Sequence, residues 1–244
     1  MMIFFDIDGT LIDHASASAA ASLRFFDHFS AAIPFEREQF PAVWEEILSK
    51  HFSRFCRGEI SIWEQRRARM REIFAAPQLT DDAADSRYGI FIGEYESLTC
   101  AYDDAAPCLE ALAGQPLGIV SNGVRYQQLG KLKRAGLLHH FSVLVFSEDV
   151  GLGKPHPSIF LEACRRAHAD PAQCVHIGDD LVADVSASFE LGMRAIWLDR
   201  LGTSQCALPV QRISNLRDLQ SVLTQDVHSP DRLRESVLKG TYGS

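Results

Sequence analysis

The sequence has no excess of positive charge. Its 244 residues include 24 Lys and Arg against 32 Asp and Glu, which gives a formal net charge of −8 at pH 7. Broad binding to nucleic acid or to anionic membranes needs a positive surface, so the composition argues against both kinds of partner. A small anionic substrate stays compatible with this charge, because a local cation can reverse the sign inside one pocket.

The sequence also lacks a long apolar segment. No uncharged run approaches the roughly 20 residues that a membrane-spanning helix requires. The apolar residues 1–5 are followed directly by Asp6 and are not preceded by a basic segment, so no secretory signal is predicted. We therefore expect a cytoplasmic protein without membrane association, present as a monomer or a homodimer.

Paired cysteines are missing as well. None of the six cysteines forms a C-x-x-C pair; they are Cys56, Cys100, Cys108, Cys164, Cys174 and Cys206. Scattered cysteines in a chain of this length are typical of buried free thiols in a reducing compartment. A disulfide framework is therefore not expected.

Short apolar runs and helical patterns alternate along much of the chain. The runs are continuous rather than alternating with polar residues, as is typical of parallel strands buried on both faces. They cover residues 2–5, 117–120, 143–146, 174–177 and 195–198. Helical patterns cover residues 105–112, 126–135, 157–168 and 180–191. This alternation predicts an α/β fold with a doubly wound parallel sheet.

Residues 14–98 interrupt the alternation with helical stretches and no convincing strand. These stretches cover residues 15–29, 35–57, 60–74 and 81–98. Inserted domains commonly enter at a loop and leave the host core intact. We therefore predict a catalytic core of residues 1–13 and 99–224, an inserted all-helical domain of residues 14–98, and a polar C-terminal tail of residues 225–244 with at most one helix.

Polar residues gather where the predicted strands end. They are Asp6 and Asp8, then Ser121 and Asn122, then Lys154 in a later loop, and finally Asp179 with Asp184 one turn further on. In open α/β sheets, ligands bind beyond the carboxyl ends of the strands, so these side chains should face one crevice.

The residue types fit phosphoryl transfer. Crowded carboxylates repel one another unless a cation lies among them, and hard oxygen ligands suit Mg²⁺. A lysine and a serine hydroxyl can bind the remaining phosphate oxygens. The reaction needs little more than positioning and charge neutralisation, and a carboxylate nucleophile divides it into two steps through an aspartyl-phosphate.

Four motifs in order resemble those of the haloacid dehalogenase-like (HAD) superfamily. The segment Asp6-Ile7-Asp8-Gly9-Thr10-Leu11 resembles its D-x-D-G-T-L motif. Ser121-Asn122-Gly123, Lys154-Pro155 and the segment from Gly178 to Asp184 resemble the second, third and fourth motifs. The resemblance implies a Rossmann-like core, with residues 14–98 at the position of the helical (C1) cap.

The resemblance also implies roles. Asp6 would be the nucleophile and a metal ligand, and Asp8 would be the general acid/base and a metal ligand through its main-chain carbonyl. Thr10 would support Asp8 by hydrogen bonding and belong to the phosphate-binding set with Ser121, the N–H of Asn122, and Lys154. Lys154 would bridge Asp6 and the phosphoryl group, Asp179 would bind Mg²⁺, and Asp184 would act through water or hold Lys154.

The implied activity is hydrolysis of a small phosphorylated metabolite, of the nucleotide or sugar phosphate class. Dehalogenases of the superfamily lack the second aspartate, so Asp8 favours phosphate over carbon–halogen substrates. A phosphomutase of the same fold, which would return the phosphoryl group to a sugar, remains an alternative. So does a binding protein without catalysis, since a fold alone does not fix a function.

Two features of the insertion leave its role open. Trp44, Phe52, Phe55 and Trp63 are predicted to form its core, although one of them could stack on a substrate. The basic segment of residues 66–71 is either a charged helix face or a contact for a substrate anion, which arginines suit.

Overall fold

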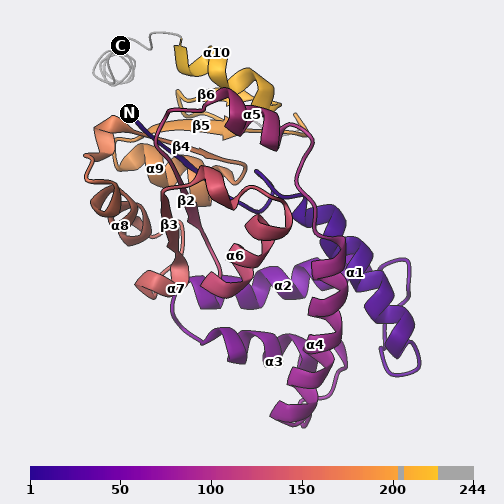
Figure 1. Ribbon diagram of the computed structural model, residues 1–244. Helices are drawn as coiled ribbons and strands as arrows, with labels where there is room; N and C mark the ends of the chain where they lie inside the picture. Colours follow the sequence, from indigo (N-terminus) through magenta and orange to yellow (C-terminus); the bar gives the residue numbers. More distant parts are fainter. Residues whose placement is uncertain (203–205, 225–244) are drawn as a thin grey trace, which may run out of the picture.

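A six-stranded parallel sheet forms the centre of the computed structural model, which describes residues 1–202 and 206–224. The strands lie in the order β3-β2-β1-β4-β5-β6 (Figure 1). They are β1 (Met2–Phe5), β2 (Leu117–Ser121), β3 (Val143–Phe146), β4 (Cys174–Gly178), β5 (Arg194–Leu198) and β6 (Gln211–Ile213). The predicted C-terminal tail, residues 225–244, lies outside the described residues.

Helices cover both faces of the sheet, because its strands are apolar on both sides. In β1, Ile3 and Phe5 point into one core, which α5 (Ala105–Ala111) and α6 (Arg125–Arg134) help to enclose. Met2 and Phe4 point into a second core on the other face, closed by α8 (Pro157–Ala167). The predicted doubly wound α/β fold is confirmed.

Strand β1 marks the point where the strand order reverses. The chain builds β2 and β3 on one side of β1, and β4, β5 and β6 on the other. Phe5, the last residue of β1, lies beside Ile119 of β2 and Ile177 of β4. The loops that follow these three strands therefore meet at one edge of the sheet, where ligands of such folds bind.

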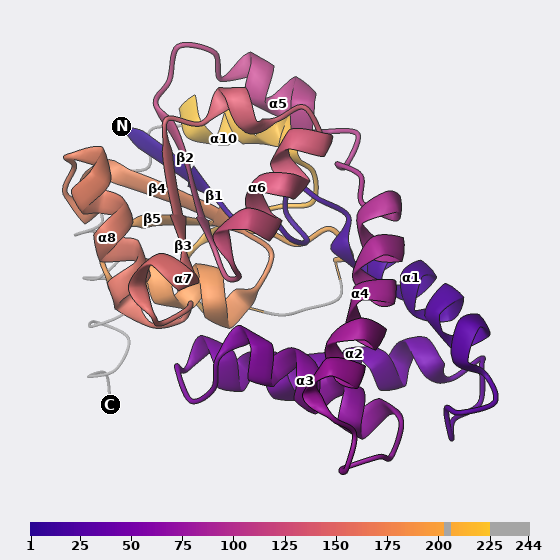
Figure 2. The same cartoon turned by 60° about the horizontal axis from the view of Figure 1, so that its bottom comes forward.

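Four long helices form the insertion and lie beyond this edge (Figures 1 and 2). They are α1 (His14–Phe29), α2 (Phe40–Cys56), α3 (Ile62–Ile73) and α4 (Asp81–Leu98). Asp13, Ser61 and Thr80 cap the starts of α1, α3 and α4 by accepting main-chain N–H groups. The helices share a separate aromatic core around Trp44. The domain boundaries at residues 14 and 98 stay a prediction.

The remaining helical elements are short. They are α7 (Ser147–Val150), α9 (Ala187–Glu190), α10 (Leu219–Thr224), η1 (Leu138–His140), η2 (Pro171–Gln173), η3 (Leu181–Ser186) and η4 (Leu216–Asp218). Within the described residues, no helix is both long and apolar enough to cross a membrane.

Three local features differ from the sequence-based expectations. Strand β6 was not expected, because its three residues, Gln-Arg-Ile, form no apolar run and pair only at the sheet edge. The helix expected over residues 180–191 is divided into a π-helical turn, η3, and α9. Trp63 is 52% exposed rather than part of the cap core, because it lies on the outer face of α3.

Candidate active site

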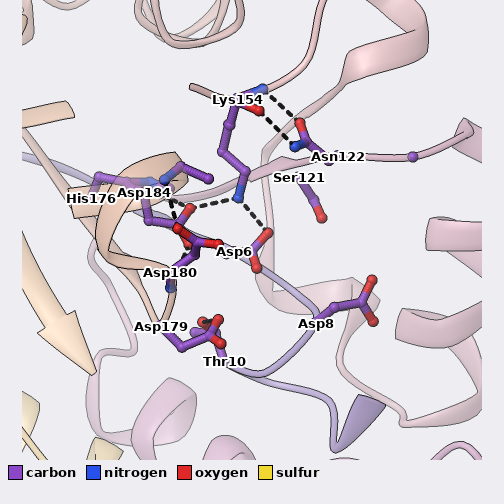
Figure 3. Close-up of polar contacts among 12 residues, drawn as sticks. Asp6, Asp8, Thr10, Ser121, Asn122, Lys154, His176, Asp179, Asp180 and Asp184 are labelled. Carbon is purple, nitrogen blue, oxygen red and sulfur yellow. Dashed lines mark hydrogen bonds and ion pairs between the residues drawn. The ribbon is translucent and has the colours of Figure 1, made fainter. Parts of the chain in front are cut away.

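Asp6 and Lys154 form a buried ion pair at the centre of the carboxyl edge (Figure 3). Asp6 directly follows β1, and its main-chain N–H still donates to Ile177 O of β4, which fixes its position. Lys154 Nζ lies 2.6 Å from Asp6 Oδ1, and both side chains are at most 9% exposed. The predicted contact between these two residues is therefore present.

Asp184 holds Lys154 from the other side. Its Oδ1 lies 2.6 Å from Lys154 Nζ and 2.9 Å from His176 Nε2. The π-helical turn η3 places the Asp184 side chain against Gly178, where any Cβ would overlap the carboxylate. Asp180 caps this turn, because its Oδ1 accepts two main-chain N–H groups.

Asp179 completes an acidic cluster with Asp6 and Asp184. One carboxylate oxygen from each of the three lies within 4.8 Å of the others. Contrary to the sequence-based expectation, the Thr10 hydroxyl donates to Asp179 Oδ1, at 3.1 Å, and not to Asp8. Gly9 makes this contact possible: it has a φ of +83°, and a Cβ there would overlap the Asp179 carboxylate.

The electrostatics of the cluster favour an added cation. Burial raises the pKa of Asp6 to about 6, although the Lys154 ammonium opposes this shift. Burial and the charge of Asp6 raise the pKa of Asp179 to about 8. For Asp184, the effect of burial is outweighed by Lys154 and His176, and the pKa is lowered to about 2. One ammonium does not neutralise three clustered carboxylates, so the donor set fits a divalent cation with oxygen ligands.

Asn122 fixes the loop that carries Lys154. Its side-chain Oδ1 accepts the Lys154 N–H at 2.7 Å, and its Nδ2 donates to the Lys154 carbonyl at 3.0 Å. Ser121, at the end of β2, is 1% exposed, and its hydroxyl accepts from Gln128 Nε2 at 2.9 Å. Ser121 and Asn122 thus both lie at the predicted edge of the sheet. The Asn122 side chain also positions the main chain of Lys154.

Asp8 belongs to a different network from Asp6. Lys131 Nζ lies 2.7 and 2.6 Å from its two carboxylate oxygens, and Gln128 Nε2 donates to Oδ2 at 3.1 Å. The Lys131 ammonium outweighs burial and lowers the pKa of Asp8. Figure 3 shows the Asp8 carboxylate apart from the contacts that join Asp6, Lys154 and Asp184.

Several residues that contact Asp8 or its loop were not predicted from the sequence. Gln128 and Lys131 lie one turn apart on α6, and His14 Nδ1 of α1 lies 3.9 Å from Asp8 Oδ1. Arg200, beyond β5, donates to the carbonyl oxygens of Gly9 and Thr10 and fixes the loop of the first motif. Only the helical spacing of Gln128 and Lys131 could have indicated a shared face, because the other contacts join distant parts of the chain.

A cavity of about 760 Å³ lies between the sheet edge and the cap helices. Asp8, Asn122 and Lys154 line it from the core, and aromatic and polar residues of α2, α3 and α4 line it from the cap. The main-chain N–H of Gly153 donates to Cys56 O at the end of α2, so the Lys154 loop and the cap are in direct contact. The polar edge therefore opens into a space large enough for a substrate of metabolite size.

Two phosphatases are similar in sequence. Over 101 residues the chain is 39% identical to glyceraldehyde 3-phosphate phosphatase of Methanopyrus kandleri, a match that covers 41% of this chain and 43% of that protein. Over 234 residues it is 26% identical to N-acylneuraminate-9-phosphatase of Rattus norvegicus, covering 91% and 92% of the two chains. The first match thus spans less than half the length of that relative.

Solved structures extend the comparison to the whole fold. The HAD-hydrolase YfnB from Bacillus subtilis, bound to magnesium, is 25% identical, with a TM-score of 0.74 over 91% of this chain and 98% of that one. A 2-haloacid dehalogenase from Pseudomonas syringae is 31% identical, with a TM-score of 0.68 over 92% and 98% of the two chains. The family model for haloacid dehalogenase-like hydrolases matches residues 1–192. With the edge geometry and this match in agreement, the chain belongs to the haloacid dehalogenase-like hydrolases.

Proposed function

We propose that the protein is an Mg²⁺-dependent phosphatase of small phosphorylated metabolites that works through an aspartyl-phosphate on Asp6. The observation that carries the proposal is the buried Asp6–Lys154–Asp184 arrangement, with a second aspartate, Asp8, two residues after the nucleophile. The similarity to phosphatases that act on different phosphorylated metabolites supports the same reaction class.

In the first step, a carboxylate oxygen of Asp6 attacks the phosphorus atom, and the bond from phosphorus to the leaving oxygen breaks. Asp8 gives its proton to that oxygen, so the leaving group departs as an alcohol. Lys154, held in place by Asp184, binds a phosphoryl oxygen together with the Ser121 hydroxyl. These contacts offset the charge that the transferring group carries.

In the second step, water attacks the aspartyl-phosphate. The Asp8 carboxylate takes a proton from that water, and Asp6 leaves as a carboxylate. Asp6, Asp179 and the main-chain carbonyl of Asp8 would hold Mg²⁺, which supplies charge neutralisation at the phosphoryl group. Lys131 holds the pKa of Asp8 below its usual range, so Asp8 must exchange this pairing for contact with the substrate and take up a proton from solvent before it can act as the acid.

Phosphate release from a panel of phosphate monoesters, with and without Mg²⁺, tests the proposal. The panel contains nucleoside monophosphates, sugar phosphates, phosphoglycolate and p-nitrophenyl phosphate. We expect release only with Mg²⁺ and mainly from one class of ester. Folded protein that releases no phosphate from any of them in the presence of Mg²⁺ would contradict the proposal.

Dehalogenation is the second candidate, because the 31% identity to a 2-haloacid dehalogenase favours it. That reaction also uses a carboxylate nucleophile, but halide leaves as an anion and needs no proton from an acid such as Asp8. Halide release from 2-chloropropionate, measured beside the phosphate panel, separates the two activities. Halide release without phosphate release would reverse the proposal.

A further inference from the structure

Unpaired hydrogen-bond donors are concentrated on one helix of the cap. The described residues contain eight buried side-chain nitrogen or oxygen atoms without a partner, and four of them belong to α3. These four are Gln65 Nε2, Arg66 Nε, Arg69 Nε and Arg69 Nη2. All four are N–H donors, so the group that would satisfy them is an acceptor.

Arg69 is the most unusual member of this group. Its side chain is 3% exposed, and no carboxylate among residues 1–202 and 206–224 forms an ion pair with it. Burial lowers the pKa of its guanidinium. The neighbouring Arg67 and Arg71 on the same helix, by contrast, pair with Asp81. A buried charge without a partner is strongly unfavourable, which indicates that a ligand supplies the missing anion.

The helix presents Arg69 and Gln65 on the same side. They are four residues apart, which places them one turn from each other on one face of α3. Both line the 760 Å³ cavity that Asp8, Asn122 and Lys154 line from the core. A single bound molecule can therefore contact the phosphate-binding edge with one end and these two donors with another.

Stacking fixes the orientation of the guanidinium. Arg69 Cζ lies 4.6 Å from the centre of the Trp44 ring and 5.7 Å from that of Phe91. Aromatic rings occupy the face of the guanidinium, so its N–H edge remains for a ligand. Nε and Nη2 form a fork that matches two oxygens of a planar acid. Both atoms are shielded from solvent in this structure, so a ligand would need the cavity wall to move before it could reach them.

The charge balance favours one negative charge at this position. Arg69 is the only cation among the donors that line the cavity on α3, Gln65 is neutral, and Glu45 brings a negative charge to the same cavity. A carboxylate matches one guanidinium and one amide and adds a single negative charge, whereas a second phosphate would add about two beside Glu45.

We propose that Arg69, together with Gln65, binds a carboxylate on the leaving group, so that the preferred substrates are phosphate monoesters of hydroxy acids. This inference rests on the phosphatase function proposed above, because it names the substrate class of that site. Arg69 selects the substrate and takes no part in the transfer of the phosphoryl group.

Binding to the Asp6→Asn variant tests the inference without turnover. Calorimetry in Mg²⁺ compares two matched pairs: 6-phosphogluconate with glucitol 6-phosphate, and 3-phosphoglycerate with glycerol 3-phosphate. We expect the acid to bind at least tenfold more tightly than the alcohol in one pair, and Arg69→Met to remove that difference. Equal binding within both pairs would overturn the inference, as would a preference that survives Arg69→Met.

Kinetics on the otherwise unchanged protein give the second readout. Arg69→Met should raise KM for the preferred acid about tenfold or more and leave kcat/KM for p-nitrophenyl phosphate within threefold. Arg67→Met, on the same helix but paired with Asp81 and Asp85, is the matched control and should change neither. If Arg69→Met does not fold, Arg69→Lys keeps the charge without the fork and should lose at least threefold of the preference; full retention would overturn the inference.

Two outcomes separate the possible failures. If p-nitrophenyl phosphate and every metabolite ester release no phosphate, the proposed function fails, while the binding experiment still reports on Arg69. If fructose 1,6-bisphosphate binds more tightly than both acids and Arg69→Met removes its advantage, the ligand of Arg69 is a phosphate and the assignment of a carboxylate is wrong.

Discussion

Polar side chains are paired on the sheet-edge wall of the cavity and unpaired on its cap wall. On the sheet edge, Lys154 contacts Asp6 and Asp184, and the Asn122 amide uses both its oxygen and its nitrogen. On the cap wall, Gln65 and Arg69 are buried with donors that meet no acceptor. These contacts of the edge are thus formed before a substrate arrives, whereas the unpaired donors of the cap wall need a ligand to satisfy them.

This difference separates chemistry from selection. Groups that act on the phosphoryl group are most effective when their positions are fixed in advance, because no reorganisation is then needed during the reaction. Donors that meet only the correct leaving group give specificity, because an analogue without the matching acceptor leaves them unpaired. Substitutions on the edge should therefore reduce turnover, and those on the cap wall should change the choice of substrate.

The largest effect should come from Asp6→Asn. The amide is a poor nucleophile, so we expect kcat to fall by about 10⁴-fold or more for every substrate that the wild type hydrolyses. Phosphate release under saturating Mg²⁺ measures the loss. Asp82→Asn, which changes an exposed carboxylate in the first turn of α4, is the matched control and should keep near-normal activity. Normal turnover by Asp6→Asn would remove the assignment of the nucleophile.

Asp8→Asn should have the second-largest effect and lower kcat for alkyl phosphates by about 10²–10⁴-fold. The leaving group of p-nitrophenyl phosphate needs no proton, so its first step should survive while hydrolysis of the aspartyl-phosphate stays slow. Rapid mixing should then show a burst of nitrophenol of about one equivalent per enzyme. A variant that loses both steps equally on both kinds of ester would show that Asp8 does not act as the acid.

A matched pair of amide substitutions compares the two walls directly. Asn122→Leu removes both contacts to the Lys154 main chain, and we expect it to lower the free energy of unfolding by about 1–3 kcal/mol. Gln65→Leu removes an amide nitrogen that has no partner, so its cost should stay within about 0.5 kcal/mol. Urea unfolding of both variants measures the difference. Equal losses would mean that the contrast between the walls does not affect stability.

The smallest effect concerns pH and Mg²⁺. The pKa of Asp179 is about 8 in the folded protein, against 3.8 as its ordinary value. Between these values the native state holds a proton that the unfolded state has lost, so rising pH lowers the stability of the metal-free protein. Mg²⁺ binds the deprotonated form, so the increase in Tm that it produces should grow between about pH 6 and 8.

Thermal unfolding at fixed ionic strength, with and without Mg²⁺, measures this increment. The Asp179→Asn variant is the control, because it cannot titrate at that position, and most of the pH dependence should disappear. An increment that stays constant from pH 5 to 9 in the wild type would contradict the assignment of Asp179 to the metal site.

The sequence by itself determined the fold and the list of edge residues. Continuous apolar runs such as residues 2–5 specify strands buried on both faces, and four of the five runs are followed directly by a polar residue. The rule that parallel strands present their carboxyl ends together then brings Asp6, Ser121 and Asp179 to one edge, where the structure places them. Their roles in catalysis stay a prediction.

Only the tertiary structure decided which side chains pair with one another. The pairing of Asp8 with Lys131 joins residues 123 positions apart, and no local pattern encodes it. The same holds for Thr10, whose hydroxyl contacts Asp179 rather than Asp8. Within the basic segment of α3, the sequence could not distinguish the paired Arg67 from the unpaired Arg69, because side-chain burial depends on packing against α2 and α4. Strand periodicity is local, whereas the partner of a charge is set by the elements that surround it.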